Sequence, residues 1–371
     1  MSSVDNSINT FLALLRAGLW GVADTNLHAN GNLFEGVEWE KIYQLAQEQS
    51  VQGIVLQGIE AVQGAWLKVH GSPLVPRILL LQWIGEVQVI EQRNKEMNAF
   101  IADLIEKLRK ADIYALLVKG QGIAQCYEKP LWRCSGDVDL LLDKENYRKA
   151  ITCVLPISSS HNPEGHYSKH KSFVVQRWSV ELHGSLRTGL STRVDRLIDH
   201  VQARSIHNRE VRVWHDGAIP VHLPGIDNDV VFIFTHYLMH FYRETLGLKQ
   251  ICDWCRLLWT YRDSLNYELL EQRIKRAGLM SEWLGFATFA VDYLGMPFEA
   301  MPLYDSISKK DKERGKQLME FILCGYSGSK LKNTISITKI FPWKTLRYSP
   351  SIFLNVNWMK VKERVFGDSS R

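Results

Sequence analysis

Asp137 and Asp139 lie two residues apart, at the start of the apolar run that ends at Leu142. Side chains of a β-strand alternate between its two faces, so residues i and i+2 point the same way. Two carboxylates on one face repel each other unless a cation lies between them, and hard oxygen ligands suit Mg²⁺ or Mn²⁺. The pair therefore predicts a metal site of the kind that phosphoryl or nucleotidyl transfer uses.

Glu181 is a third carboxylate that fits this pair. It lies between apolar neighbours in Ser179-Val-Glu-Leu-His183, on a later predicted strand. If that strand pairs beside the aspartate strand, Glu181 reaches the same face. Three carboxylates on two neighbouring strands form the usual ligand set of a two-metal site. There one metal lowers the pKa of an acceptor hydroxyl, and the other holds a triphosphate and neutralises the leaving pyrophosphate.

The turn Lys119-Gly120, which ends an earlier apolar run, could bind phosphate groups. Lys binds phosphate as a point charge, and Gly lets the backbone approach a ligand closely. The alternative for Lys119 is a solvated turn lysine. Arg133 either holds a phosphate or forms a salt bridge with Asp137, and Gly136 provides tight backbone geometry beside the ligand. We therefore predict that Lys119, Gly120, Arg133 and Gly136 bind the nucleotide.

Three histidines are candidates for the acceptor side of the site. His183 could touch a metal-bound phosphate or be a hydrogen-bonded filler, and His170 precedes the predicted strand 172–176. His236 and His240 are spaced i,i+4 on a predicted helix and could ligate zinc, but the glutamate of an HExxH motif is missing. A polar stripe that faces the cleft, or a packed core pair, is the alternative for these two residues.

Helices must flank this chemistry, because the 3.6-residue apolar period dominates both ends of the chain. Residues 7–110 are predicted to be helical, with a long helix from about Arg77 to Lys110 that ends in cations. Between the flanks, the predicted strands are 113–118, 138–142, 172–176 and 178–182, and the predicted helices are 121–127 and 143–155, the latter opened by Asp143 as N-cap. A short helix (191–201), a strand or hairpin (211–220) and further helices (228 to about 295) follow.

These patterns divide the chain into four predicted regions. They are an N-terminal helical domain (1–111), an α/β core that carries the site (112–225), a helical domain (226–300) and a basic C-terminal region (301–371). The last region has 14 Lys and Arg against 6 Asp and Glu. Such a region could meet polyanions or a membrane surface, although a solvated face is the simpler interpretation.

The bulk composition is that of an ordinary globular protein, with 46% hydrophobic and 23% charged residues. A net charge of +5 is too small to indicate nucleic-acid binding. The sequence suggests no transmembrane segment and no secretory signal. The six cysteines lack the spacing of a disulfide framework, so we expect a cytoplasmic protein.

The motifs between residues 113 and 183 resemble those of the uncharacterised nucleotidyltransferase family of bacteria, a branch of the DNA-polymerase-β-like superfamily. They are Ile113-Tyr-Ala-Leu-Leu-Val-Lys-Gly120, Tyr127, Pro130, Arg133, Gly136-Asp-Val-Asp-Leu-Leu-Leu142 and Val180-Glu-Leu-His183. A looser likeness covers residues 42–51 and the segment from Phe234 to Asp253. One turn departs from the superfamily, whose minimal enzymes have Gly-Ser where this chain has Lys119-Gly120.

The resemblance implies an α+β fold, in which a small mixed-sheet nucleotidyltransferase core (β-α-β-α-β) is flanked by N- and C-terminal helical domains. It also implies transfer of a nucleoside monophosphate from an NTP to an acceptor hydroxyl, with pyrophosphate release and Mg²⁺ or Mn²⁺ as cofactor. The acceptor could be a small molecule, a protein or a tRNA end. The alternatives are a catalytically inactive nucleotide-binding scaffold or partner subunit, and a metal-dependent phosphohydrolase.

Overall fold

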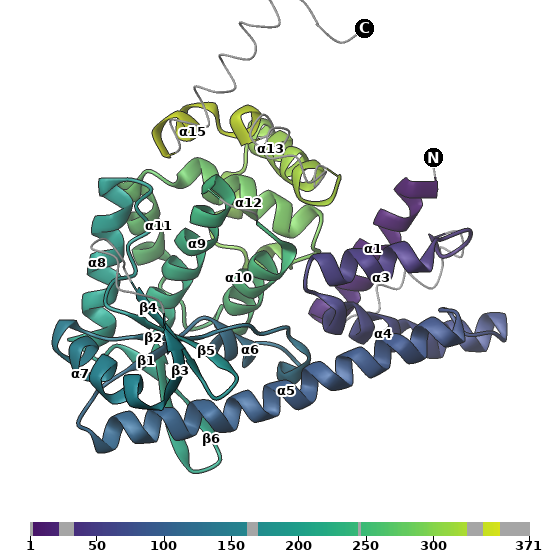
Figure 1. Cartoon of the computed structure of the whole chain (residues 1–371). Helices are drawn as coiled ribbons and strands as arrows, with labels where there is room; N and C mark the ends of the chain where they lie inside the picture. The colour runs from purple at the N-terminus through teal and green to yellow at the C-terminus, as the bar shows by residue number, and fades with distance from the viewer. Residues whose placement is uncertain (1–2, 22–32, 162–169, 244–245, 325–336, 349–371) are drawn as a thin grey trace, which may run out of the picture. The chain divides into compact units, whose positions relative to one another are not determined.

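Five short strands form one mixed sheet around the predicted site residues (Figure 1). Their order is β1-β2-β5-β4-β3, and β2 and β5 are the parallel pair, whereas the other neighbours are antiparallel. The strands are β1 (Leu116–Val118), β2 (Val138–Leu141), β3 (Ser158–His161), β4 (His170–Val175) and β5 (Trp178–His183). The predicted α+β class, with helices around a mixed sheet, is confirmed at this level.

The structure is a computed structural model, and it describes residues 3–21, 33–161, 170–243, 246–324 and 337–348. It divides into two units. The first comprises Met1–Arg187, Ile198–Ile233 and Leu248–Leu265, and the second comprises Thr188–Leu197, Phe234–Gly247 and Asn266–Arg371. None of the described helices is both long enough and apolar enough to cross a membrane.

One face of the sheet is buried under two helices, α5 (Arg77–Lys110) and α7 (Lys144–Val154). Alternate strand residues supply this face, among them Leu117, Leu140, Phe173, Val180 and Leu182, which form one core cluster with residues of both helices. Because the side-chain period of a strand is two, the intervening residues of β2 and β5 must lie on the opposite face. That second face, which we call the open face because it lies opposite to α5 and α7, carries the polar groups of the site.

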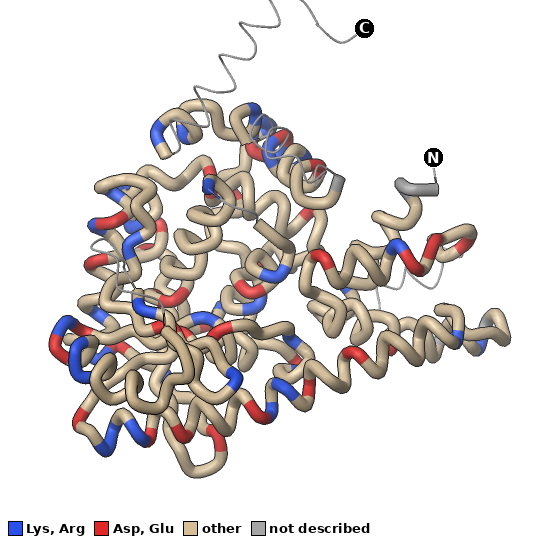
Figure 2. The backbone as a smooth tube through the Cα atoms, in the orientation of Figure 1, with Lys and Arg blue, Asp and Glu red and all other residues tan. Residues whose placement is uncertain are grey.

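Helix α5 is the main support of the first unit, and the prediction of one helix from Arg77 to Lys110 is confirmed. Its last turn holds Lys107, Arg109 and Lys110, where cations interact favourably with the helix dipole. Charges of both signs follow one another along its length, as Figure 2 shows. Two of the i,i+4 ion pairs among them are Lys95–Glu91 at 2.7 Å and Lys110–Glu106 at 3.0 Å.

The first unit also contains several further helices and a second, two-stranded sheet. Helices α1 and α4 cross closely at Gly18. A Cβ at this position would lie only 1.9 Å from the Ile54 carbonyl oxygen, so the crossing requires a glycine there. Helix α7 begins at its N-cap Asp143, whose carboxylate accepts from the Asn146 backbone N–H at 2.7 Å, as predicted. The other elements are α1 (Ser3–Trp20), α3 (Trp39–Glu48), α4 (Gln52–His70), α6 (Gly120–Ala124), the two-stranded sheet of β6 (Val211–Asp216) and β7 (Ile219–Pro224), and α10 (Leu248–Thr260).

The second unit is helical in its described part. Its core includes edge-to-face contacts of Phe241 with Phe286 and a tilted contact of Phe234 with Trp283, at centroid distances of 5.5 and 4.7 Å. Its helices are α11 (Tyr267–Ala277), α12 (Met280–Asp292), α13 (Lys309–Met319) and α15 (Pro342–Tyr348). Helices α8 (Thr192–Ile206) and α9 (Ile226–Arg243) contribute residues to both units.

Three of the differences between the predicted elements and the structure concern strands. Strand β3 was not predicted, because Ser158-Ser-Ser-His161 has no apolar alternation, so the sheet has one strand more than expected. Strand β1 begins at Leu116 and not at Ile113. The segment after residue 211 is a hairpin that continues to Pro224, and it forms a separate sheet.

Candidate active site

Two carboxylates meet on the open face of the sheet. In the parallel β2–β5 pair, Asp139 is directly opposite Glu181, and Leu141 is opposite His183. Asp139 is buried and Glu181 is half-buried. Like charges directly opposite each other are destabilising, so the pair needs positive charge close by.

Lys119 supplies that charge, and His183 adds to it when it is protonated. The Lys119 ammonium lies 2.7 Å from Asp139 Oδ1, and the His183 Nε2 donates to the same oxygen at 2.8 Å. His183 Nε2 also lies 3.3 Å from Glu181 Oε2. The site is therefore a chain of alternating charge, from Lys119 through Asp139 and His183 to Glu181.

The pKa values follow from these contacts. Burial alone would raise the pKa of Asp139, but the Lys119 charge and the His183 hydrogen bond outweigh it and hold this pKa well below its usual range. The His183 hydrogen bond also lowers the pKa of Glu181, against burial and the Asp139 charge. For His183 itself, burial lowers the pKa, whereas the hydrogen bonds to both carboxylates raise it above its ordinary value. Both carboxylates are thus held in the ionised form that can ligate a cation.

The backbone of the Lys119-Gly120 turn is strained. Lys119 has φ 61° and ψ −152°, a combination that is nearly exclusive to glycine, and Gly120 follows at φ 43°. A non-glycine residue in this region costs about 1–3 kcal/mol, and such residues gather at functional sites. A Cβ at Gly120 would lie 3.4 Å from the Asp137 carbonyl oxygen. The turn is therefore a close neighbour of residues 133–137, the loop before β2, which we call the aspartate loop.

Asp137 and Gly136 are exposed at the end of that loop, immediately before β2. Asp137 precedes Asp139 by two residues, but it lies just before the first residue of β2. No atom would come within 4 Å of a Cβ at Gly136, so this glycine borders open space. The loop therefore presents Asp137 to solvent, beside the buried Asp139.

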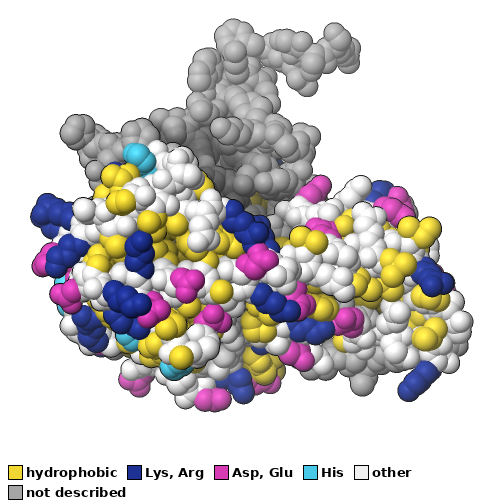
Figure 3. Space-filling model, turned by 60° about the horizontal axis from the view of Figure 1, so that its bottom comes forward, with side chains coloured by type: hydrophobic (Ala, Val, Ile, Leu, Met, Phe, Trp, Pro, Cys, Tyr) yellow, Lys and Arg dark blue, Asp and Glu magenta, His cyan; other side chains and the backbone are white. Residues whose placement is uncertain are grey.

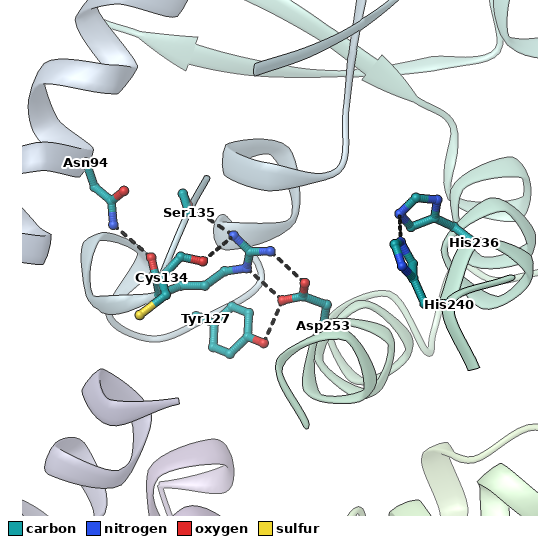
Figure 4. A network of polar contacts seen from close by, with 8 residues as sticks. Asn94, Tyr127, Cys134, Ser135, His236, His240 and Asp253 are labelled. Atoms are coloured by element: carbon teal, nitrogen blue, oxygen red, sulfur yellow. Dashed lines mark hydrogen bonds and ion pairs between the residues drawn. The ribbon is translucent and has the colours of Figure 1, made fainter. Parts of the chain in front are cut away.

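Arg133 has a different partner from the one that we considered. Its Nε and Nη2 donate to the two oxygens of Asp253 at 2.7 and 2.6 Å, and its Nη1 donates to the Ser135 hydroxyl at 3.0 Å and to the Cys134 carbonyl at 3.2 Å (Figure 4). Tyr127 also donates to Asp253, at 2.8 Å. Both Arg133 and Asp253 are buried. The structure pairs Arg133 with Asp253 and not with Asp137, and this buried ion pair holds the aspartate loop. A contact of Arg133 with a phosphate stays a prediction.

The same loop is fixed from its other side by Asn94 of α5. The Asn94 amide donates to the carbonyl oxygens of Leu131 and Arg133, both at 2.8 Å (Figure 4 shows the second of these bonds). Its own carbonyl oxygen accepts from Gln121 of α6 at 2.8 Å. Helices α5, α6 and α10 thereby set the position from which Asp137 leaves the loop.

His170 extends the polar cluster on β4. It lies opposite His183 in the β4–β5 register, with its Nε2 3.8 Å from Glu181 Oε1. Ligand atoms of His170, Glu181 and His183 all lie within 4.8 Å of one another, so together they could hold a metal ion. His236 belongs to the second unit, where its Nε2 lies 3.1 Å from that of His240 (Figure 4).

A family model described as uncharacterised nucleotidyltransferase matches residues 35–295. The chain belongs to this family. Searches of curated proteins and of solved structures found no match. Family membership makes the chain a nucleotidyltransferase at the level of reaction class, and the matched segment includes every strand of the sheet.

One charged group of this nucleotidyltransferase was missed by sequence reasoning. Lys249 lies on α10, four residues before Asp253, and residues at this spacing share one face of a helix. Burial lowers its pKa and Arg133 lowers it further, whereas the charges of Asp253, Cys134 and Asp137 raise it. Lys249 is therefore a cation that is partly withdrawn from water near the aspartate loop. Nothing in the sequence near Lys249 indicates this neighbourhood.

Proposed function

We propose that the protein transfers a nucleoside monophosphate from an NTP to an acceptor hydroxyl, with Asp137, Asp139 and Glu181 as its catalytic carboxylates. The observation that carries the proposal is the register of β2 and β5, in which Asp139 and Glu181 lie side by side on the open face of the sheet. Family membership supports the reaction class. The strained turn beside the carboxylates supports a role for this face in binding.

In the proposed reaction, the acceptor oxygen attacks the α-phosphorus of the NTP. A bond forms between this oxygen and the α-phosphorus, the bond from the α-phosphorus to the bridging oxygen breaks, and pyrophosphate leaves with the electron pair. The hydroxyl proton passes to Glu181, which is more accessible to solvent than Asp139. The open face of the sheet holds the acceptor and the donor in line.

The carboxylate oxygens of the site have the chemistry that a divalent cation prefers, and Glu181 also belongs to the group of ligand atoms that lie within 4.8 Å of one another. Asp137, Asp139 and Glu181 would hold it through carboxylate oxygens, the ligands that Mg²⁺ and Mn²⁺ prefer. When bound, such ions lower the pKa of the acceptor hydroxyl and neutralise the pyrophosphate. The ionised state of Asp139 and Glu181, which their depressed pKa values indicate, favours this ligation.

Two lysines are suited to the triphosphate. Lys119 already lies against Asp139, and Gly120 brings the backbone next to the aspartate loop. Lys249 adds a second positive charge near the same loop. Lys binds phosphate as a compact point charge, and partial withdrawal from water strengthens such an interaction. Arg133 contributes indirectly, because its pairing with Asp253 fixes the loop.

The acceptor class is left open between a small molecule, a protein and a tRNA. Figure 3 shows Lys or Arg and Asp or Glu side chains intermixed on the face that it displays. Recognition of a long nucleic acid typically uses a basic stripe on one face. The modest net charge of +5 therefore argues against a long nucleic acid as the acceptor.

The proposal is tested with α-labelled NTPs, Mg²⁺ or Mn²⁺, and three separate acceptor pools: small molecules, proteins and tRNA. We expect pyrophosphate release together with label on one pool, and a loss of about a hundredfold or more in rate for Asp137→Asn and Asp139→Asn. Asp143→Asn is the matched control, because it makes the same change four residues further on and Asn is an equally good N-cap.

Other outcomes identify the rival functions. Free nucleotides as the sole labelled products would indicate a phosphohydrolase, and metal-dependent binding without turnover would indicate a scaffold. The site assignment fails if Asp137→Asn and Asp139→Asn both leave metal-dependent binding of a non-hydrolysable NTP unchanged.

A further inference from the structure

We propose that His170, Glu181 and His183 form a metal position with two nitrogen ligands, which binds Mn²⁺ or Zn²⁺ more tightly than Mg²⁺. This inference deepens the proposed function, because Glu181 belongs to both the carboxylate set and the new position. It concerns the choice of metal, which the three carboxylates alone do not determine.

Strand register brings these ligands together. In the antiparallel β4–β5 pair, His170 lies opposite His183 and Ser172 lies opposite Glu181. Residues that face each other across paired strands project to the same side of the sheet, so both imidazoles and the carboxylate share the open face. The two rings lie 5.2 Å apart, centroid to centroid, and are tilted by 43°.

The spacing of the ligand atoms suits one small ion. Tetrahedral ligation with bonds of about 2.1 Å places ligand atoms roughly 3.4 Å apart. One ligand atom from each of the three residues lies within 4.8 Å of the other two. His183 Nε2 is 3.3 Å from Glu181 Oε2, and His170 Nε2 is 3.8 Å from the other carboxylate oxygen, Oε1. Small side-chain adjustments would therefore bring the three ligands to the spacing that one ion requires.

The chemistry of the ligands selects the metal. Imidazole nitrogen suits Zn²⁺ and other transition metals, whereas Mg²⁺ takes oxygen ligands and keeps several waters. Two His and one Glu are also the protein ligands of several open zinc sites. A position that offers two imidazoles and one carboxylate should therefore discriminate against Mg²⁺.

Residues around the proposed metal position fix the geometry of its ligands. His183 is buried, and its Nε2 lies between Asp139 and Glu181, so the proton on this nitrogen occupies the place that an ion would take. Asp139 remains held by Lys119 when that proton is replaced. Such partners around the ligands typically change metal affinity by about 10–100-fold.

The test uses the full-length protein without a polyhistidine tag, freed of metal and titrated with Mn²⁺, Zn²⁺ or Mg²⁺ by calorimetry. Co²⁺ serves as a spectroscopic probe, because its visible absorption is much stronger in a four- or five-coordinate protein site than in the hexaaqua ion. We expect His170→Ala to weaken Mn²⁺ and Zn²⁺ binding at least about tenfold and to reduce the Co²⁺ band, with little change in Mg²⁺ affinity. His161→Ala is the matched control, since this exposed histidine lies on the neighbouring strand β3.

Equal Mn²⁺ affinity in wild type and His170→Ala would overturn the inference, as would Mg²⁺ binding as tight as that of Mn²⁺. Glu181→Gln provides a second variant, because it keeps the shape of the side chain while it removes a charged ligand. Metal binding that depends on His170 without any nucleotidyl transfer would contradict the proposed function alone. Transfer that depends on Asp137 and Asp139 but not on His170 would contradict this inference alone.

Discussion

Replacement of Asp253 by Asn tests the buried ion pair that holds the aspartate loop. Arg133 and Asp253 have side chains that are 5% and 8% exposed, and they make two hydrogen bonds at 2.6–2.7 Å. Asn keeps the shape and can still accept from Tyr127, so the substitution removes mainly the negative charge. Burial lowers the pKa of Arg133, and Asp253 raises it above its ordinary value. Arg133 stays charged without its partner, because a guanidinium is not deprotonated in proteins.

An uncompensated buried charge determines the magnitude. Loss of one partner from a buried pair destabilises a protein by about 3–5 kcal/mol, which is roughly a factor of 10² to 10⁴ in the unfolding equilibrium. The chain offers a matched control in Arg187 and Asp199, which make the same two-bond arrangement at 2.7 and 2.5 Å but are 54% and 40% exposed. Asp199→Asn should cost about 1 kcal/mol or less, because solvent screens an exposed pair.

Chemical unfolding of wild type and both variants measures the two effects. When the free energy of unfolding falls with denaturant concentration at the same slope in wild type and variant, the shift of the midpoint measures the change in stability. A double variant, Arg133→Met with Asp253→Leu, should recover much of the loss, since it leaves no buried charge unpaired. If Asp253→Asn and Asp199→Asn destabilised the protein equally, burial would not determine how much the Arg133 pair contributes to stability.

Three other substitutions test the local structure of the site. Lys119→Gly should be more stable than Lys119→Ala by about 1–3 kcal/mol, because Gly relieves the strained backbone. Both variants lose the ion pair with Asp139, so this loss cancels in the comparison. Thermal unfolding would refute the prediction if the Ala variant were the more stable. Asn94→Ala should destabilise by about 1–3 kcal/mol for each loop carbonyl left without a donor, and unchanged unfolding would show that this anchor is dispensable. Asp143→Ala should cost about 1 kcal/mol as a lost N-cap, whereas Asp143→Asn should be neutral, and an equal loss in both would contradict a capping role.

Local patterns in the sequence predicted the supports of the site. The apolar period indicated α5 over its full length, and the Asp N-cap indicated where α7 begins. The two-residue period of the strands, together with their pairing, placed Glu181 on the same face as Asp139. These features depend on residues that are close in the chain or on one strand pairing, so a sequence pattern carries them.

Contacts between distant residues were beyond the reach of such patterns. Arg133 and Asp253 are 120 residues apart, and no periodicity links them. The polar strand β3 lacks an apolar alternation and is defined by its pairing with β4. The approach of His183 to both carboxylates follows from the parallel register of β2 and β5, which no single segment encodes.

The Lys119 turn shows how two opposing energies decide which residue the site uses. Glycine would relieve about 1–3 kcal/mol of backbone strain at this position. Lysine instead neutralises Asp139, and a buried carboxylate that lost its partner would cost about 3–5 kcal/mol. The side-chain contribution is the larger of the two, particularly because Glu181 lies directly opposite and adds repulsion. This difference is a physical reason why the turn can hold a lysine at position 119, where the backbone conformation alone favours glycine.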